Sequence, residues 1–238
     1  MRHEYRYGLH VAFDSLPALE PLILKTQDRG VFQRFVNASR RRQFCLKADW
    51  AITIGDAAPA LGIEGTVVVP VAYRGEPTIL DGASVPLPWV VSYLTFGLLR
   101  PLGILLTASI VHDFAYRHGA LLLRMPDGSL EPRAVERHLA DELFRDIVAS
   151  VNQSPVASRI AWHAVRLGWP FIPYAGKRGG GKAPVRSALT ALVALASLVP
   201  LVRSIGVGGV LAGIGAGYAL LSIAQRFNPQ RTPRIDPE

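Results

Sequence analysis

Residues 110–117 read Ile-Val-His-Asp-Phe-Ala-Tyr-Arg, and they bring His112 and Asp113 side by side at the end of a strongly apolar stretch. The pattern predicts a helix over residues 103–118 that ends near Gly119. On such a helix His112 and Asp113 point about 100° apart, and Tyr116 lies one turn beyond His112. A histidine and an aspartate in these surroundings are expected to be partly buried and to need polar partners.

A second helix, predicted from Pro132 to about residue 151, offers such a partner in Asp141. A short loop joins the two predicted helices, so we expect them to pack antiparallel with Asp141 pointing inward. Asp141 then accepts a hydrogen bond from His112, which orients the ring and raises its basicity. Networks of this kind also serve as satisfied polar groups in helical cores, so the spacing leaves a catalytic and a structural role open.

A cation site is expected beside this pair. Asp113 faces away from Asp141, and Asp81 lies in the turn Asp-Gly-Ala-Ser-Val-Pro at residues 81–86, from which it could reach the same cation. Hard oxygen ligands favour calcium or magnesium over zinc.

Upstream of the first helix, two segments predict a small sheet. Residues 44–55 alternate apolar and polar side chains, and residues 65–72 are rich in β-branched side chains. Further helices are predicted at residues 89–99 and 158–167. The expected fold class is α+β, mainly α: a small β-sheet, then a helical core with an antiparallel helix pair, then a C-terminal membrane hairpin.

The hairpin is predicted from an apolar tail. Residues 187–202 and 204–224 carry no charge, and the longer segment is long enough to cross a bilayer as a helix. Gly209, Gly213 and Gly217 share one helix face, which predicts close packing and a homo-oligomer. Basic residues flank the tail, and the net charge is +8. We therefore expect a lipid bilayer with anionic phospholipid headgroups as the partner, and no nucleic acid.

The organisation expected from these patterns has five parts. An N-terminal extension covers residues 1–42, a globular domain 43–174, a flexible basic linker 175–185, the membrane segments 186–226 and a tail 227–238. Cys45 is the only cysteine, so no disulfide forms within the chain, and the N-terminal residues lack the apolar run of a signal peptide.

Two resemblances follow from the motifs. Asp-Gly-Ala-Ser-x-Pro at 81–86, His-Asp-Phe-x-Tyr-Arg at 112–117 and Ala-Asp-x-x-Phe at 140–144 resemble, in this order, the domain of unknown function 1353 family, which is common in bacteriophages and prophages. The second motif, followed by an aspartate on the next helix, also looks like the prokaryotic branch of secreted phospholipase A₂. The cysteines that form disulfide bonds in those enzymes are absent here.

The phospholipase resemblance implies specific roles. His112 would be the general base that activates water, Asp141 would hold His112, and Tyr116 would support the pair through its hydroxyl. Asp81 and Asp113, helped by a backbone carbonyl near Gly82, would bind calcium, which would stabilise the oxyanion of the attacked ester.

The function expected from the sequence is therefore a membrane-tethered, calcium-dependent lipid or ester hydrolase of phage or prophage origin. The alternative is a non-enzymatic phage-particle or lysis-associated membrane protein with a structural His-Asp-Tyr network. The expected localisation is the membrane, with the globular domain on the cytoplasmic side, or the phage particle.

Overall fold

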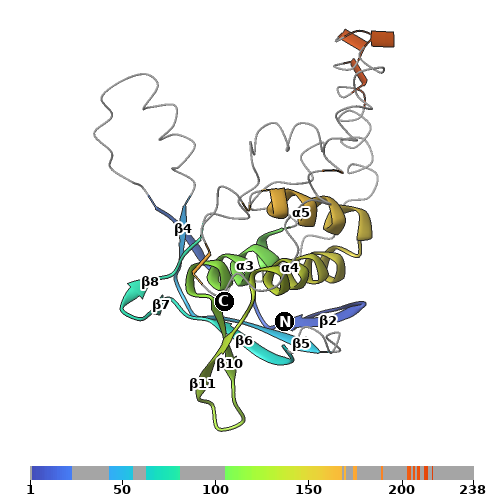
Figure 1. Cartoon of the computed structure of the whole chain (residues 1–238). Helices are drawn as coiled ribbons and strands as arrows, with labels where there is room; N and C mark the ends of the chain where they lie inside the picture. The colour runs from blue at the N-terminus through green and yellow to red at the C-terminus, as the bar shows by residue number, and fades with distance from the viewer. Residues whose placement is uncertain are drawn as a thin grey trace, which may run out of the picture.

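The computed structural model describes residues 2–22, 43–55, 63–80, 105–167, 169 and 174–175, together with isolated positions of the tail at 189, 203–204, 206, 208–209, 212–213 and 216. A six-stranded antiparallel sheet forms one layer, and helices pack against one of its faces (Figure 1). The candidate site lies in the helical layer.

The large sheet has the strand order β1-β2-β5-β6-β10-β11, and every neighbouring pair is antiparallel. Its strands are β1 (His3–Tyr7), β2 (Leu9–Phe13), β5 (Trp50–Gly55), β6 (Gly65–Val69), β10 (Ala120–Arg124) and β11 (Leu130–Ala134). A three-stranded sheet has the order β3-β4-β9, from β3 (Leu19–Pro21), β4 (Phe44–Leu46) and β9 (Ile79–Leu80). The strands β7 (Ala72–Tyr73) and β8 (Glu76–Pro77) form a two-stranded ribbon.

The core lies between the large sheet and the helices. Along β5 the side chains of Trp50, Ile52 and Ile54 are buried in alternation with partly exposed neighbours, as a period of two requires. Val67 and Val69 of β6 lie opposite Ile52 and Trp50 in the register and are buried as well. These β-branched and aromatic side chains give the sheet one apolar face, and burying that face positions the helices above it.

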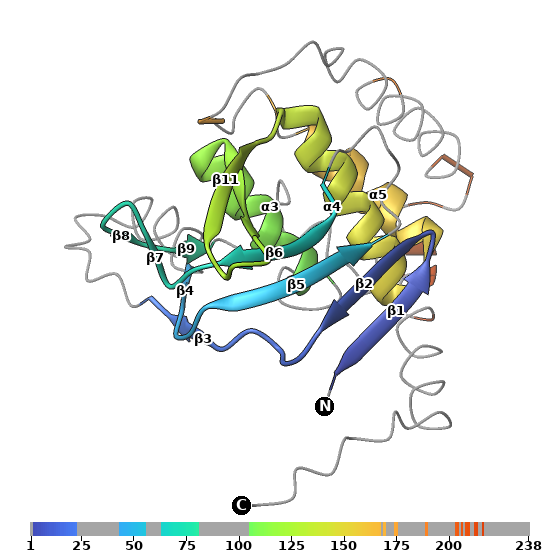
Figure 2. The same ribbon diagram turned by 90° about the horizontal axis from the view of Figure 1, so that it is seen from below.

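The helices of the described residues lie over that face in two tiers: α3 (Leu106–His118) and α4 (Arg137–Asn152) on the sheet, and α5 (Pro155–Leu167) above α4. Helices α3 and α4 lie side by side on the sheet, and α5 packs on α4 on the side away from the sheet (Figures 1 and 2). Helix α3 ends where Gly119 adopts a left-handed conformation with φ 65° and donates its N–H to Ala115. Glycine adopts this conformation without steric cost, which explains the stop.

Strands β1 and β2 form one edge of the large sheet, although they fall in the segment predicted as an N-terminal extension. Both strands contact α4. The hydroxyl of Ser150, which is fully buried near the end of α4, donates a 2.6 Å hydrogen bond to the carbonyl of Leu9. The N-terminal hairpin is therefore part of the globular core.

The expected fold class, a mainly α protein with a small sheet, is wrong. The connection between α3 and α4 is the hairpin β10–β11, where a short loop and the start of a helix at Pro132 were predicted. Leu121, Leu122 and Leu123 are buried in β10, which pairs with β6, so the apolar run after Gly119 extends the sheet. Pro132 is exposed in the edge strand β11, a position where its missing N–H leaves no central hydrogen bond unmade.

The single strand predicted over residues 44–55 is two strands in different sheets. Residues 47–49 separate β4 from β5, and β4 pairs with β3 and β9. Strand β6 has the predicted β-branched composition and ends before Pro70. The helix predicted at 89–99 and the linker 175–185, apart from Ala175, lie outside the described residues.

The predicted C-terminal membrane hairpin is contradicted, and with it the expected membrane localisation. In the described part of the chain, no helix is both long enough and apolar enough to cross a bilayer. Only isolated positions of the segment 186–226 are described, and of the three glycines that were predicted to share a packing face, Gly217 is not among them.

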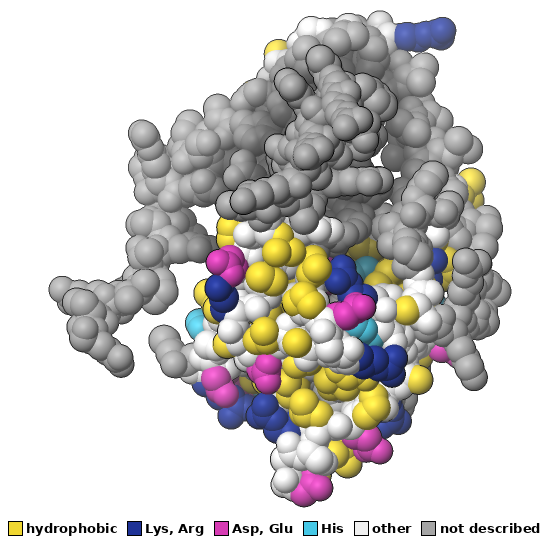
Figure 3. All heavy atoms as spheres, turned by 90° about the vertical axis from the view of Figure 1, so that its left-hand side faces the viewer, with side chains coloured by type: hydrophobic (Ala, Val, Ile, Leu, Met, Phe, Trp, Pro, Cys, Tyr) yellow, Lys and Arg dark blue, Asp and Glu magenta, His cyan; other side chains and the backbone are white. Residues whose placement is uncertain are grey.

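On the face that lies to the left in Figure 1, acidic, basic and hydrophobic side chains of the described residues are interspersed (Figure 3). The formal charge of +8 is therefore not gathered into one patch of described residues on this face.

Candidate active site

The centre of the site is a buried pair formed by His112 of α3 and Asp141 of α4. The Nε2 atom of His112 lies 2.9 Å from Oδ1 of Asp141, so the predicted hydrogen bond between the two helices is confirmed. His112 is 5% exposed and Asp141 is 0% exposed. A carboxylate removed from water in this way is stable only when its oxygens accept hydrogen bonds.

Two further donors meet that need. The hydroxyl of Tyr116 donates to Oδ1 of Asp141 at 2.6 Å, and the indole Nε1–H of Trp169 donates to Oδ2 at 2.7 Å. Burial, followed by the charge of Asp141, raises the pKa of Tyr116 far above its ordinary value, so this hydroxyl stays protonated and acts as a donor. Both oxygens of Asp141 are therefore engaged.

The other nitrogen of His112 is in a different situation. Nδ1 is buried and makes no hydrogen bond to any described group, and Oδ1 of Asp113 lies 3.8 Å away, within ion-pair range. Since Nε2 carries the proton that is donated to Asp141, the neutral ring has its lone pair on Nδ1. A buried polar atom without a partner is rare and is commonly explained by a water molecule or a ligand.

The surroundings of His112 favour its charged form. Burial lowers the pKa of His112, but the interactions with Asp113 and Asp141 outweigh burial and raise that pKa to about 9. His112 is thus an imidazolium at neutral pH in the folded chain, and it becomes a base as the pH rises. The rings of Tyr116 and Phe144 pack against it, with centroids 4.1 and 5.0 Å away.

A buried arginine stands next to the pair. Arg137, the first residue of α4, is 4% exposed, and its Nε donates to the Tyr116 hydroxyl at 3.2 Å. Its guanidinium lies over the rings of Tyr116 and Trp169, 5.0 and 4.8 Å from the centroids. Stacking between two aromatic faces stabilises a desolvated guanidinium.

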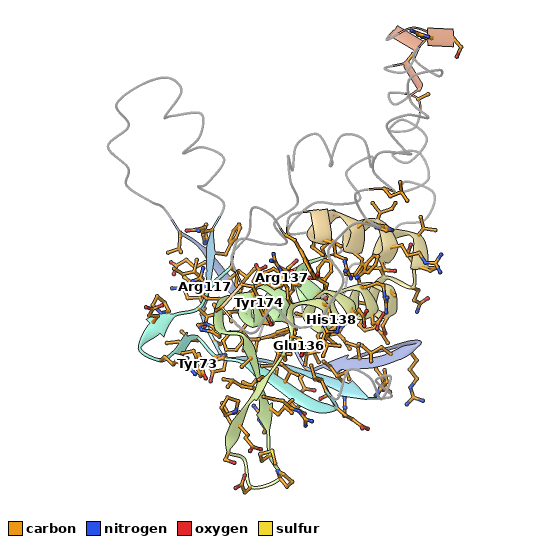
Figure 4. The ribbon with its side chains drawn as sticks, viewed as in Figure 1. Tyr73, Arg117, Glu136, Arg137, His138 and Tyr174 are labelled. Carbon is orange, nitrogen blue, oxygen red and sulfur yellow. The ribbon has the colours of Figure 1, made fainter. Side chains whose placement is uncertain are left out.

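Tyr174 closes the end of this cluster. Its ring meets that of Tyr116 edge to face at 5.0 Å, and its hydroxyl donates to the carbonyl of Val135. Burial, followed by the charge of Asp141, raises the pKa of Tyr174 to about 12. Figure 4 shows Arg137 and Tyr174 close together between α3 and the start of α4.

The predicted cation ligands are only partly described. Asp113 lies on α3 beside His112, whereas Asp81 and Gly82 lie outside the described residues. Within the described ranges, no group of three or more His, Cys, Asp or Glu residues is arranged to hold a metal ion. The described residues alone therefore do not form the expected calcium site.

Three residues of the cluster were not predicted: Arg137, Trp169 and Tyr174. Arg137 precedes Asp141 by four positions, which places both on one face of a helix, so the spacing gave a usable signal. Trp169 lies 28 residues after Asp141, and no local spacing connects the two.

Residues 64–165 match the family model described as "Protein of unknown function (DUF1353)". No curated protein and no solved structure matches the chain at a significant level. The matched segment runs from β6 into α5 and contains His112, Asp113, Tyr116 and Asp141. The match supports the resemblance to the DUF1353 family, whose function is unknown, for the segment that carries the buried His-Asp pair.

Proposed function

We propose that the chain is an ester hydrolase in which His112 acts as a general base on water, with acyl esters of the lipid class as substrates. One observation carries the proposal: Asp141 holds Nε2 of His112, while Nδ1 has no hydrogen-bond partner among the described residues. This is the arrangement that a general base needs, because one ring nitrogen is fixed and the other keeps its lone pair for a proton. The resemblance to phospholipase A₂ and a phage or prophage origin belong to the same proposal.

The chemistry requires three events. Nδ1 of the neutral His112 removes a proton from a water molecule, and the resulting hydroxide attacks the ester carbonyl. The tetrahedral intermediate then breaks its bond to the alcohol oxygen, which takes the proton from the His112 imidazolium. The products are a carboxylic acid and an alcohol, and His112 returns to its neutral form.

Asp141 and Tyr116 support these steps without contacting the substrate. The carboxylate of Asp141 stabilises the imidazolium that forms when the water is deprotonated. Tyr116 and Trp169 keep that carboxylate in one orientation, because each donates to one of its oxygens. General-base catalysis by a positioned histidine contributes about 10²–10⁴-fold to a rate.

Calcium remains a proposal that depends on Asp81, Gly82 and Asp113. Calcium would supply a positive charge for the oxyanion.

A second function is favoured by the burial of the histidine. With 5% exposure and a pKa of about 9, His112 also fits a permanent imidazolium between two carboxylates. In this reading the network only stabilises the contact between α3 and α4, and the protein is not an enzyme.

A hydrolysis assay distinguishes the catalytic role from the structural role. Fatty-acid release is measured on phospholipid in mixed micelles and on a short-chain soluble ester, with calcium and with a chelator. The intact chain is compared with His112→Gln, and His10→Gln is the matched control, because His10 lies on β2 and pairs with Glu4 at 2.8 Å.

The hydrolase proposal predicts product release by the intact chain and by His10→Gln, with a loss of at least about 10²-fold in His112→Gln. Folded protein that releases no acid from either substrate between pH 7 and about 10, with or without calcium, would favour the structural role.

A further inference from the structure

We propose that Trp169 is a positioning residue for the general base, because its indole N–H fixes the second oxygen of Asp141 and so fixes the orientation of the carboxylate that holds His112. The inference rests on the proposed hydrolase function and adds a residue from outside the segment that matches the family model.

The first observation is how hydrogen-bond donors are distributed over the two oxygens of Asp141. Oδ1 accepts hydrogen bonds from His112 and Tyr116, at 2.9 and 2.6 Å. The only donor to Oδ2 in the described part of the chain is Trp169, at 2.7 Å. The two oxygens of a carboxylate turn together about the Cβ–Cγ bond, a torsion with broad minima, and each donor narrows its range. A donor on the second oxygen narrows that range further and helps to keep Oδ1 in place for His112.

The second observation is that Trp169 is itself held in place. Its carbonyl accepts a 3.2 Å hydrogen bond from Arg137, and the same guanidinium lies 4.8 Å from the ring centroid. Arg166, 9% exposed, lies 4.9 Å from the ring. Trp169 therefore has contacts from α4 and from the end of α5, and both contribute to the orientation of its N–H.

The third observation concerns the residues that follow. The N–H of Ala175 donates to the carbonyl of Tyr116 at 3.0 Å, and Tyr174 bonds to the carbonyl of Val135. Position 169 thus contacts α4 and positions 174 and 175 contact α3, so each touches one of the two helices that carry the His-Asp pair. Since the family match ends at residue 165, this part of the site comes from beyond the matched segment.

The chain contains a matched control for Trp169. Trp162 on α5 also faces Arg166, 4.6 Å from its ring centroid, but its buried Nε1 has no hydrogen-bond partner among the described residues. Trp162→Phe therefore removes an indole in similar surroundings without removing a bond to Asp141. Trp169→Phe keeps an aromatic ring for Arg137 and removes the donor, and both replacements reduce the side chain by the same amount.

The experiment measures kcat and KM of the full chain for the micellar and the soluble ester. Trp169→Phe should lower kcat by about ten-fold, the loss expected for one hydrogen bond to a charged acceptor, with KM unchanged. Trp162→Phe should change both constants by less than about two-fold. Both variants are compared at equal folded fraction, measured by urea unfolding, so a loss of stability cannot imitate the effect.

A spectroscopic measurement on the unmodified chain keeps the inference testable if Trp169→Phe does not fold. The assigned indole Nε1–H resonance of Trp169 should lie downfield and exchange slowly with solvent. It should shift when His112 is replaced by Gln, since both donate to Asp141, while the Trp162 resonance should stay in place.

The outcomes separate the two proposals. Suppose the chain is active. The positioning role is then overturned, and the hydrolase proposal stands, if Trp169→Phe keeps the kcat of the unmodified chain or if the resonance of the Trp169 indole proton does not shift in His112→Gln. An inactive chain in which that proton still responds to His112→Gln overturns the hydrolase, while Trp169 remains the residue that orients Asp141.

Discussion

Replacing Tyr116 by Phe should lower the free energy of unfolding by about 2 kcal/mol, because it removes one buried donor from Asp141. The change deletes a single oxygen atom. The Phe ring still packs against His112, Tyr174 and Arg137, whose present distances from the Tyr116 ring are 4.1, 5.0 and 5.0 Å.

The magnitude follows from two hydrogen bonds of unequal strength. The Tyr116 hydroxyl donates to a carboxylate at 2.6 Å, and a bond to a charged group contributes about 1.5–3 kcal/mol. The hydroxyl oxygen of Tyr116 also accepts a longer hydrogen bond, of 3.2 Å, from Arg137. In the variant, Arg137 loses this acceptor but keeps the carbonyl of Trp169. Asp141 also keeps His112 and Trp169 as donors, so the loss stays below the 3–5 kcal/mol typical of breaking a buried ion pair.

Urea unfolding measures this difference as a shift of the midpoint at constant slope. Tyr5→Phe is the matched control, because the Tyr5 ring stacks on Phe13 at 5.8 Å and its hydroxyl makes no hydrogen bond with the described residues. The control should change the free energy of unfolding by less than about 0.5 kcal/mol. A Tyr116→Phe variant that is as stable as Tyr5→Phe would refute the view that Asp141 depends on this donor.

Three further predictions concern the same cluster. Asp141→Asn should cost about 3–5 kcal/mol of unfolding free energy, since it leaves the His112 imidazolium without its closest counter-charge; a loss below about 1 kcal/mol in urea would contradict this. The pKa of His112 is raised from 6.5 to about 9, so its contribution to stability is complete below about pH 6.5 and is lost as the pH rises through 9. The unfolding free energy should therefore fall by up to about 1.4 kcal/mol per pH unit in that window, relative to His112→Gln, and parallel profiles of the two proteins would count against the shift. Hydrolysis without calcium should rise with pH up to about 9, and calcium bound at Asp113 should move that rise to lower pH, because a cation there cancels one of the charges that favour the imidazolium; a profile that is identical with calcium and with chelator would exclude a cation beside His112.

The His112–Asp141 contact was predictable because α3 is apolar along most of its length, while α4 is amphipathic and its inward face follows from the helical period. His112 and Tyr116 are one turn apart on α3, and the inward side of α4 is marked by Leu143 and Phe144, both buried. Period and spacing fix which side chains share a face, and that information is local in the sequence.

The sheet was underestimated for a physical reason. The apolar residues 120–124 are compatible with a helix or a strand. They form a strand because Leu122 and Leu123 pair with Val68 and Val67 of β6. Strand pairing depends on residues more than fifty positions away, so periodicity within a window could not reveal it. The same limit applies to Trp169, whose bond to Asp141 is a product of tertiary packing.

The bond between Ser150 and Leu9 joins positions 141 residues apart, and it has a consequence for synthesis of the chain on the ribosome. The hairpin β1–β2 leaves the exit tunnel before α4 does, and α4 contacts both strands in the folded chain. Leu9, Val11 and Phe13 are buried in the folded chain, and before α4 is made they lack that helix to pack against. A nascent chain with such an early unpaired strand edge is prone to association with other chains and is a natural client for chaperones.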